Sequence, residues 1–338
     1  MNRRPDRAAV LGAGSWGTAL AIHLARAGHD VALWGRDRHL MTTIAESRVN
    51  SAYLPGLPLP AAVSPTPHLH DALAGARYVV VAVPSHGLRG VMREAASHLV
   101  ADAVLISATK GLETDSLMRM SQVIAAETAG QLPVVVLSGP SFASEVARGC
   151  HTALVAASTD ARAARAVQDE FRAPYFRLYG SDDVVGVEMG GALKNVIAIA
   201  AGAVEGLGLG HNAMAALVTR GLAEISRLVF AMGGRRETMS GLGGLGDLIL
   251  TCTGSLSRNH HVGLELGRGR SVAEVLGGMR MVAEGVNTAS AAMALGERHR
   301  VELPIAAEVA AVIAGLKTPR EAVECLMLRP QRGELEGE

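Results

Sequence analysis

Residues 8–25 read A-A-V-L-G-A-G-S-W-G-T-A-L-A-I-H-L-A, and this stretch decides the fold of the first half of the chain. Apolar residues 8–11 predict a short strand, which runs directly into the pattern G-x-G-x-x-G at Gly12, Gly14 and Gly17. A helix is expected over residues 17–27, and a second strand over residues 30–34. Glycines in this context let backbone N–H groups approach a pyrophosphate at the helix N-terminus. The stretch therefore predicts a dinucleotide-binding unit with the three glycines at the cofactor.

Strand and helix alternate along the first half of the chain, as in a parallel sheet covered on both faces. Five prolines in residues 53–67 predict an irregular loop with short extended pieces. From about residue 182 the segments become long, apolar and helical. We therefore predict an α/β, Rossmann-like NAD(P)-binding domain over residues 1–182 and an all-α substrate and catalytic domain over residues 183–338. Further strands are expected at residues 77–83, 103–107, 134–137, 152–157 and 176–179.

Composition argues against several classes of protein. Lys and Arg balance Asp and Glu at 32 each, so the 338-residue chain has no net charge and no general surface for nucleic acid. No charge-free run reaches the roughly 18 apolar residues that span a bilayer. Cys150, Cys252 and Cys325 lie far apart without metal-ligand spacing, so we expect buried, reduced thiols and no metal site. These properties predict a cytoplasmic globular protein without a general nucleic-acid or membrane surface.

One lysine stands out in residues 187–210, a run that is almost wholly small and apolar. Lys110, Lys194 and Lys317 are the only lysines in the chain, so arginine supplies nearly all of its positive charge. Lysine can give up its proton where arginine cannot, and burial lowers the pKa of a lysine. Lys194 is therefore a candidate proton donor or acceptor. The alternative is that its side chain extends from a buried helix to solvent.

The end of the second strand bears on the choice of cofactor. An NAD enzyme is expected to carry Asp or Glu there, which binds the ribose hydroxyls. This chain has Arg36 followed by Asp37, and a guanidinium suits both an adenine ring and a 2′-phosphate. Arg36 therefore favours NADPH, while Asp37 leaves NADH open.

Hydride transfer to a carbonyl requires a proton donor, and Lys194 fits that role. Lys110 follows the strand at residues 103–107, and ligands meet such sheets at the carboxyl ends of strands. It is the natural second cation, able to orient substrate oxygens. Asp247 can hydrogen-bond either a lysine or a substrate hydroxyl.

Ser257, Arg258 and Asn259 stand where a helix is expected to open. A hydroxyl, a guanidinium, an amide and a helix N-terminus together suit a phosphate. The simpler alternative is an N-cap serine followed by a surface arginine. Glu284 either meets a cofactor ribose or amide, or is an exposed carboxylate near a helix start.

Together these motifs resemble bacterial NAD(P)-dependent glycerol-3-phosphate dehydrogenases, and the matching blocks follow the family's order from residue 12 to about residue 288. The resemblance implies reversible reduction of dihydroxyacetone phosphate to sn-glycerol 3-phosphate with NADPH or NADH, which supplies the backbone of glycerophospholipids. It also implies a C-terminal domain like that of 6-phosphogluconate dehydrogenase. The main blocks are G-A-G-S-W-G-T-A-L-A at 12–21, S-G-P-S-F-A-S-E-V at 138–146, G-A-L-K-N-V-I-A-I-A-A-G at 191–202, G-L-G-G-L-G-D-L-I-L-T-C at 241–252, S-R-N at 257–259 and V-A-E-G-V-N-T at 282–288.

The resemblance also implies roles for individual residues. The expected catalytic residues are Lys194, as acid and base, with Lys110 and Asp247. Besides the three glycines, cofactor contacts are implied at Ser15, Trp16, Arg36, Lys110, Ala143, Arg258, Val282 and Glu284. Substrate contacts are implied at Lys110, Gly139, Ser141, Lys194, Asp247, Ser257, Arg258 and Asn259, and Asn195 joins them as the neighbour of Lys194. A homodimer is also expected.

Two other functions remain open at this point. A related two-domain reductase of a hydroxy acid, keto acid or imine would not need a phosphate on its substrate. A non-catalytic NADPH-sensing protein would bind the cofactor and use its helical domain as a partner surface.

Overall fold

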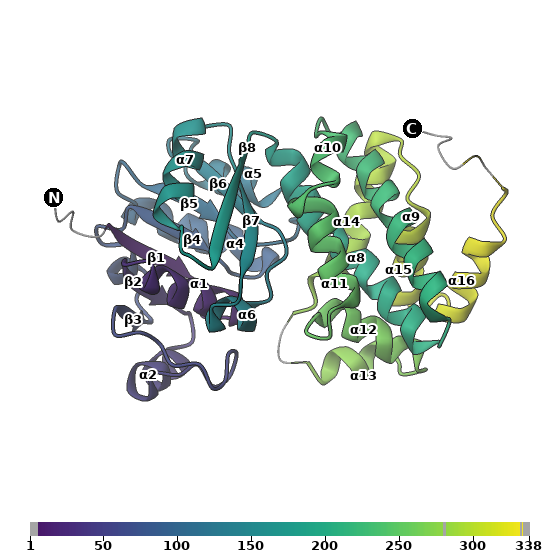
Figure 1. Ribbon diagram of the computed structural model, residues 1–338, viewed down its shortest axis with the longest axis horizontal. Helices are drawn as coiled ribbons and strands as arrows, with labels where there is room; N and C mark the ends of the chain where they lie inside the picture. Colours follow the sequence, from purple (N-terminus) through teal and green to yellow (C-terminus); the bar gives the residue numbers. More distant parts are fainter. Residues whose placement is uncertain (1–5, 280–281, 332, 334–338) are drawn as a thin grey trace. The chain divides into compact units, whose positions relative to one another are not determined.

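The computed structural model describes residues 6–279, 282–331 and 333. They form two compact units, each with its own core (Figure 1). The first unit comprises Met1–Lys110 and Met118–Val184, and the second comprises Gly111–Leu117 and Val185–Glu338. The first unit is built from a sheet and helices and the second from helices, so the predicted fold class is confirmed.

One sheet of eight strands forms the first unit, in the order β3-β2-β1-β4-β5-β6-β7-β8. Every neighbouring pair is parallel except β6 and β7. The order of the first six strands is that of dinucleotide-binding sheets, which take ligands outside the carboxyl ends of their strands. The strands are β1 (Arg7–Leu11), β2 (Asp30–Trp34), β3 (Val63–Thr66), β4 (Tyr78–Val81), β5 (Val104–Ser107), β6 (Val134–Ser138), β7 (Thr152–Ala157) and β8 (Phe176–Ser181).

Two strands depart from the expected pattern. β3 lies in the proline-rich stretch that was expected to be irregular, and it pairs with β2 alone at the edge of the sheet. An edge strand tolerates Pro65 because the ladder needs donors on one side only. β7 runs antiparallel to β6, since the chain leaves β6 through a short helix and re-enters the sheet from the same end.

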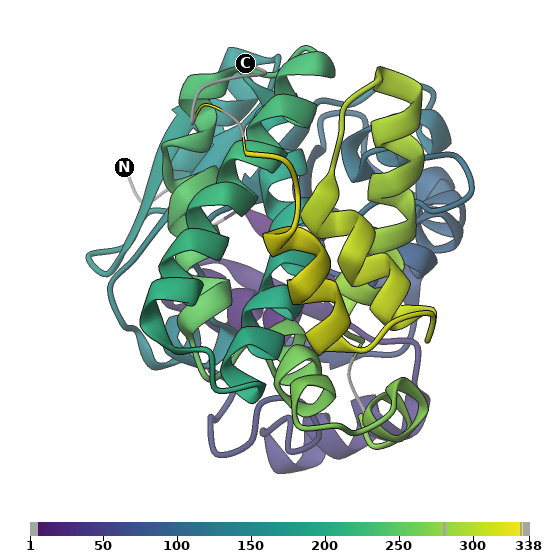
Figure 2. The ribbon, with the colours of Figure 1, turned by 90° about the vertical axis from the view of Figure 1, so that its right-hand side faces the viewer.

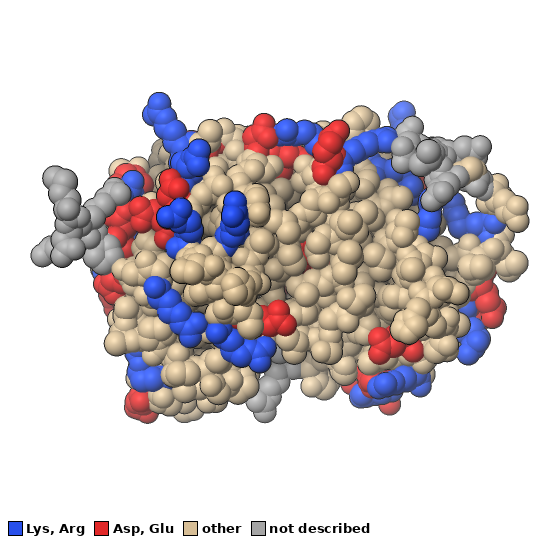
Figure 3. Space-filling model, viewed as in Figure 1, with Lys and Arg blue, Asp and Glu red and all other residues tan. Residues whose placement is uncertain are grey.

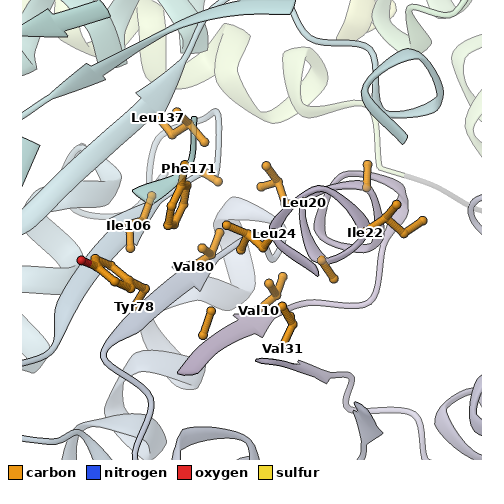
Figure 4. Packing of buried hydrophobic residues seen from close by; sticks show 14 of the residues in the cluster. Val10, Leu20, Ile22, Leu24, Val31, Tyr78, Val80, Ile106, Leu137 and Phe171 are labelled. Carbon is orange, nitrogen blue, oxygen red and sulfur yellow. The ribbon is translucent and has the colours of Figure 1, made fainter. Parts of the chain in front are cut away.

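The core of the first unit lies between the sheet and the helices that cover it. Leu20 and Leu24 of α1 lie over Val10 of β1 and Val80 of β4, and Phe171 closes the cluster beside Tyr78 (Figure 4). The helices are α1 (Ser15–Arg26), α2 (Arg38–Ser47), α3 (Leu69–Leu73), α4 (Ser85–Ala95), α5 (Met120–Glu127), α6 (Ala143–Arg148) and α7 (Ala161–Glu170), with the 3₁₀ turn η1 (Ala96–His98).

The second unit is organised around α8 (Val184–Gly206), most of whose residues are buried. Among the described residues beyond β8 the structure contains helices and no strand, as expected. Figure 2 looks onto α14, α15 and α16, which pack in sequence order. The other elements are α9 (Gly210–Ala231), α10 (Arg236–Met239), the π-helical turn η2 (Leu242–Gly246), α11 (Asp247–Thr253), α12 (Arg258–Gly267), α13 (Val272–Gly277), α14 (Glu284–His299), α15 (Pro304–Ile313) and α16 (Pro319–Met327).

Close packing of α8 against α12 explains why residues 187–210 are so small. A Cβ on Gly263 of α12 would overlap the carbonyl oxygen of Ile199, and a Cβ on Gly202 of α8 would overlap that of His260. Gly206 and Gly267 meet one turn further along. The two backbones therefore touch, and only glycine fits at these four positions. By length and composition α8 could cross a membrane, yet 78% of its most apolar window is buried in this unit, as befits a core helix.

We expect Gly263→Ala to destabilise the second unit by about 3 kcal/mol, because the added methyl group forces the two helices apart. The matched control is Gly277→Ala on α13, where a Cβ would meet no atom within 4 Å. That substitution should leave stability unchanged or raise it by up to about 1 kcal/mol, since alanine favours the helix. Urea unfolding of the two variants measures the difference, and equal stabilities would contradict the packing account.

The segment Gly111–Leu117 packs with the helical unit although it lies between β5 and α5 in the chain. Leu112 is buried in the helical core, and Leu117 adopts a left-handed conformation with φ 60° as the segment leaves it. Lys110 is thus the last residue of the first unit before the chain enters the second. No local sequence pattern predicts that this segment packs with the helical unit.

Charged side chains of both signs are interspersed with large uncharged areas on the face drawn in Figure 3. The expectation of three buried thiols is confirmed for Cys252 and wrong for the other two. Cys150 and Cys325 are exposed, because Cys150 follows the left-handed Gly149 that ends α6 and Cys325 lies on the outer side of α16.

Candidate active site

The glycine turn after β1 is tightly packed at Gly12 and Gly17 and leads directly into α1. Gly12 has φ +122°, and a Cβ there would lie 2.5 Å from the carbonyl oxygen of Ala82. A Cβ on Gly17 would overlap the carbonyl oxygen of Gly12. Gly14 is the N-cap of α1, and among the described residues no side chain caps it. Helix N-termini of this kind bind anions through their first N–H groups, which is the role the motif predicts here.

Two side chains brace this turn, Asn50, for which no role was expected, and Ser15, an expected cofactor contact. The buried Asn50 donates from Nδ2 to the carbonyl oxygen of Ala13 and to Oγ1 of Thr18, each at 2.8 Å. Ser15 donates its hydroxyl to the carbonyl oxygen of Tyr53 at 2.6 Å. The loop after α2 is thereby tied to the glycine turn. Asn50 lies 32 residues from Thr18 in the chain, so no local pattern could have revealed the contact.

Arg36 and Asp37 have different surroundings at the end of β2. The carboxylate of Asp37 accepts from the backbone N–H of Leu40 at 3.1 Å and so caps α2. Arg36 is exposed, and it stands at the carboxyl end of β2 where the cofactor's adenosine end is expected. The structure therefore assigns the acidic residue a helix-capping role and leaves the guanidinium at the surface.

Lys110, Gly139 and Ser141 come together at the carboxyl ends of the neighbouring strands β5 and β6. Nζ of Lys110 donates to the carbonyl oxygen of Gly139 at 2.8 Å and approaches Oγ of Ser141 at 3.5 Å. Ser141 donates to the same carbonyl at 2.9 Å. Gly139 has φ +130°, which a side chain rarely adopts. Ala143 follows as the first residue of α6.

Lys194 is buried in the second unit and does not extend to solvent. Its Nζ donates to Oδ1 of Asp247 and, at 2.8 Å, to Oγ1 of Thr251, which both belong to α11. Burial disfavours the ammonium, while the fully buried carboxylate beside it stabilises the charge. Lys194 and Asp247 therefore form a buried ion pair inside the helical core. The interpretation of Lys194 as a snorkelling surface lysine is wrong.

Thr251 is a site residue that the sequence analysis missed. Its hydroxyl donates to the carbonyl oxygen of Asp247, so its lone pairs face Nζ of Lys194. The signal was present, because residues four apart share one face of a helix and Asp247 was already a candidate. The next residue, Cys252, is a neutral thiol, since burial raises its pKa to about 12 against the opposing charge of Lys194. It is no nucleophile at neutral pH.

The start of α12 combines the two interpretations that its sequence allowed. Ser257 is the N-cap, and its Oγ accepts from the backbone N–H of His260 at 3.2 Å. Arg258 donates from Nη1 to the carbonyl oxygen of Val282 at 2.8 Å and is otherwise exposed. Glu284 is the first residue of α14. An N-cap serine and an anion site at the same helix N-terminus are therefore compatible.

Two buried amides complete this part of the second unit. Asn259 donates from Nδ2 to Oδ1 of Asn195 at 2.9 Å, and its own Oδ1 accepts from the backbone N–H of Gly285 at 2.9 Å. Asn195 is the neighbour of Lys194 on α8. One network thus links α8, the start of α12 and the start of α14. Among the described residues no group of three or more His, Cys, Asp or Glu side chains could hold a metal ion.

Two protein-family models match the chain, and together they cover most of it. The model described as "NAD-dependent glycerol-3-phosphate dehydrogenase N-terminus" matches residues 7–164. The model described as "NAD-dependent glycerol-3-phosphate dehydrogenase C-terminus" matches residues 183–324.

Curated and solved relatives agree with these matches. The chain is 53% identical over 334 residues to glycerol-3-phosphate dehydrogenase [NAD(P)+] of Koribacter versatilis, covering 98% of this chain and 99% of that protein. It is 52% identical over 331 residues to the enzyme of the same name from Geobacter sulfurreducens, covering 97% and 99%. The crystal structure of glycerol-3-phosphate dehydrogenase from Coxiella burnetii superposes with a TM-score of 0.93 at 39% identity, covering 96% of this chain and 99% of that one.

Proposed function

Since the chain belongs to the NAD-dependent glycerol-3-phosphate dehydrogenase family and reduces dihydroxyacetone phosphate to sn-glycerol 3-phosphate with NADH or NADPH, we propose that Lys194 supplies the proton for this reduction. The observation that carries the proposal is the buried ion pair of Lys194 with Asp247. Reduction of a ketone adds a hydride to carbon and a proton to oxygen. A protonated amine held inside an apolar core suits the second step.

The chain's own groups prepare Lys194 for proton transfer. Asp247 stabilises the ammonium before the transfer, and Thr251 orients it by accepting from Nζ. As hydride reaches the substrate carbon, the carbonyl oxygen takes a proton from Nζ and becomes the hydroxyl of the product. The neutral amine then takes up a proton from water, and the carboxylate of Asp247 favours the protonated form. In the reverse direction the amine accepts the hydroxyl proton.

The first unit fits a dinucleotide cofactor, because Gly12 and Gly17 leave no room for side chains in the glycine turn and no described side chain caps the start of α1. NADPH or NADH bound there supplies the hydride. We propose that Gly12, Gly14, Gly17, Ser15, Trp16, Arg36, Lys110 and Ala143 contribute cofactor contacts from this unit, and that Arg258, Val282 and Glu284 contribute them from the second. We also propose the division of roles expected from the sequence, with residues 1–182 binding most of the cofactor and residues 183–338 carrying the catalytic lysine.

We propose that two groups of residues bind the phosphorylated substrate. Ser257, Arg258 and Asn259 offer a helix N-terminus, a guanidinium and an amide to the phosphate. Lys110, Gly139 and Ser141 offer a second cation and a hydroxyl, and Asn195 adds an amide beside Lys194. A reductase of hydroxy acids, keto acids or imines would not need a phosphate on its substrate. An NADPH-sensing protein would bind the cofactor without oxidising it. Consumption of NADPH with dihydroxyacetone phosphate but hardly with dihydroxyacetone is the test.

We also propose that the chain prefers NADPH to NADH. The carboxylate of Asp37, which would bind the ribose hydroxyls of NADH, caps α2 by accepting from the N–H of Leu40, and Arg36 is exposed beside it. We expect Arg36→Ala to raise the Kd of NADPH about 10- to 100-fold and to change that of NADH little, since only NADPH carries a 2′-phosphate.

Binding can be followed by the fluorescence of Trp16 in the glycine turn. Arg38→Ala, at the first position of α2, is the matched control and should leave both dissociation constants unchanged. Equal weakening of NADPH and NADH by Arg36→Ala would contradict the preference. A cytoplasmic location and a homodimer are further proposals, supported by three free cysteines and by the exposed apolar side chains of Phe230, Ile249 and Leu256.

A further inference from the structure

One backbone group, the N–H of Gly285, fixes the orientation of the buried side-chain amides of Asn259 and Asn195. The N–H of Gly285, in the first turn of α14, can only donate, so Oδ1 of Asn259 must face it. Nδ2 of Asn259 then faces Asn195, whose Oδ1 must accept. Nδ2 of Asn195 is left with a long contact of 3.5 Å to the carbonyl oxygen of Gly191. The direction of every hydrogen bond in the pair thus follows from Gly285.

This direction has a chemical consequence beside Lys194. Both amide carbonyl oxygens are taken up inside the network, and both NH₂ groups retain hydrogens that the network does not use. A site that is to hold a phosphate needs donors and must avoid acceptors. If the pair were reversed, two carbonyl oxygens would face the ligand.

We propose that Gly285 is a positioning residue that sets the polarity of the Asn259–Asn195 amide pair, so that the pair presents N–H donors to the phosphorylated substrate. The inference rests on the proposed function of this site. Gly285 lies in the block V-A-E-G-V-N-T, but neither the sequence motifs nor the proposed contacts give it a role.

Glycine is required at this position by space. A Cβ on Gly285 would lie 2.5 Å from the carbonyl oxygen of Asn195 and 2.9 Å from Oδ1 of Asn259. Gly285→Ala therefore moves the start of α14 away from both asparagines and breaks the first bond of the network. Gly296 of the same helix is a matched control, because a Cβ there would lie 2.9 Å from the carbonyl oxygen of Val301, far along the helix from the amides.

The test compares kcat/KM for dihydroxyacetone phosphate with kcat/KM for dihydroxyacetone. We expect Gly285→Ala to lower this ratio about tenfold or more, through KM, because an amide donor to a charged group is misdirected. Gly296→Ala should lose thermal stability but keep the ratio of the parent chain. In an Asn259→Ala background, adding Gly285→Ala should change the ratio less than about twofold, because the hydrogen bond between Gly285 and Asn259 is already lost.

An unchanged ratio in Gly285→Ala, an equal fall in Gly296→Ala, or additive effects with Asn259→Ala would overturn the proposal. If Gly285→Ala does not fold, Asn259→Asp and Asn259→Ala decide it. Aspartate still accepts from the N–H of Gly285 but has no N–H to offer, so Asn259→Asp should lower the ratio about as far as Asn259→Ala does. A ratio in Asn259→Asp equal to that of the parent chain would overturn it. Failure of the proposed function would give a different result, because a Lys194 variant would then reduce dihydroxyacetone phosphate at the parent's rate.

Discussion

Lys194→Arg should fold, bind NADPH as the parent chain does, and lose about a thousandfold or more of its kcat. The guanidinium keeps the positive charge beside Asp247, so no buried carboxylate is left unpaired. It does not release its proton in the range where the enzyme works. Its planar fork also differs from the tetrahedral ammonium that bonds to Asp247 and Thr251. NADPH oxidation at saturating dihydroxyacetone phosphate measures the loss.

The chain offers a matched control for this variant. Lys317 is another of its three lysines, and its Nζ pairs with both carboxylate oxygens of Glu308, at 2.8 and 2.7 Å. Lys317→Arg preserves that pair and should leave kcat unchanged. A Lys194→Arg enzyme that retains more than about a tenth of the parent's kcat would refute acid catalysis by this lysine.

The second large effect concerns the phosphate. We expect Arg258→Ala to raise the KM for dihydroxyacetone phosphate about 100-fold and to leave the weak turnover of dihydroxyacetone nearly unchanged. The guanidinium is anchored on the carbonyl oxygen of Val282, which leaves its other N–H groups for an anion. Steady-state kinetics with both substrates gives the two values, at an NADPH concentration that saturates the variant.

Arg268→Ala, at the other end of α12, is the control. Arg268 pairs with Glu265 at 2.9 Å and should contribute nothing to either KM. The phosphate assignment fails if Arg258→Ala weakens the two substrates equally, because the lost interaction would then not involve the phosphate.

Local signals account for what the sequence predicted well. The glycine pattern after an apolar strand specified the turn, its helix and the first strands of the sheet, because each depends on neighbouring residues only. The scarcity of lysine pointed to Lys194, and the polar run at the start of α12 pointed to Ser257 and Arg258. In each case the chemistry could be inferred from residue type and position.

Contacts between distant segments account for what it did not predict. The proline-rich β3 is a strand only because β2 offers it an edge, and β7 is antiparallel because of where the chain re-enters the sheet. The roles of Asn50 and Gly285 depend on partners about 30 residues away in the chain. The small residues of α8 suggested burial but not the contact with the backbone of α12, which required the fold.

The most direct test of the central claim is a single-turnover experiment on Lys194→Ala with NADPH already bound. Removal of the side chain leaves a space between Asp247 and Thr251 that a small primary ammonium ion can fill. On mixing with dihydroxyacetone phosphate, we predict that the bound NADPH is oxidised only when methylammonium is added. Oxidation at the parent's rate without methylammonium would contradict the assignment of Lys194 as the proton donor.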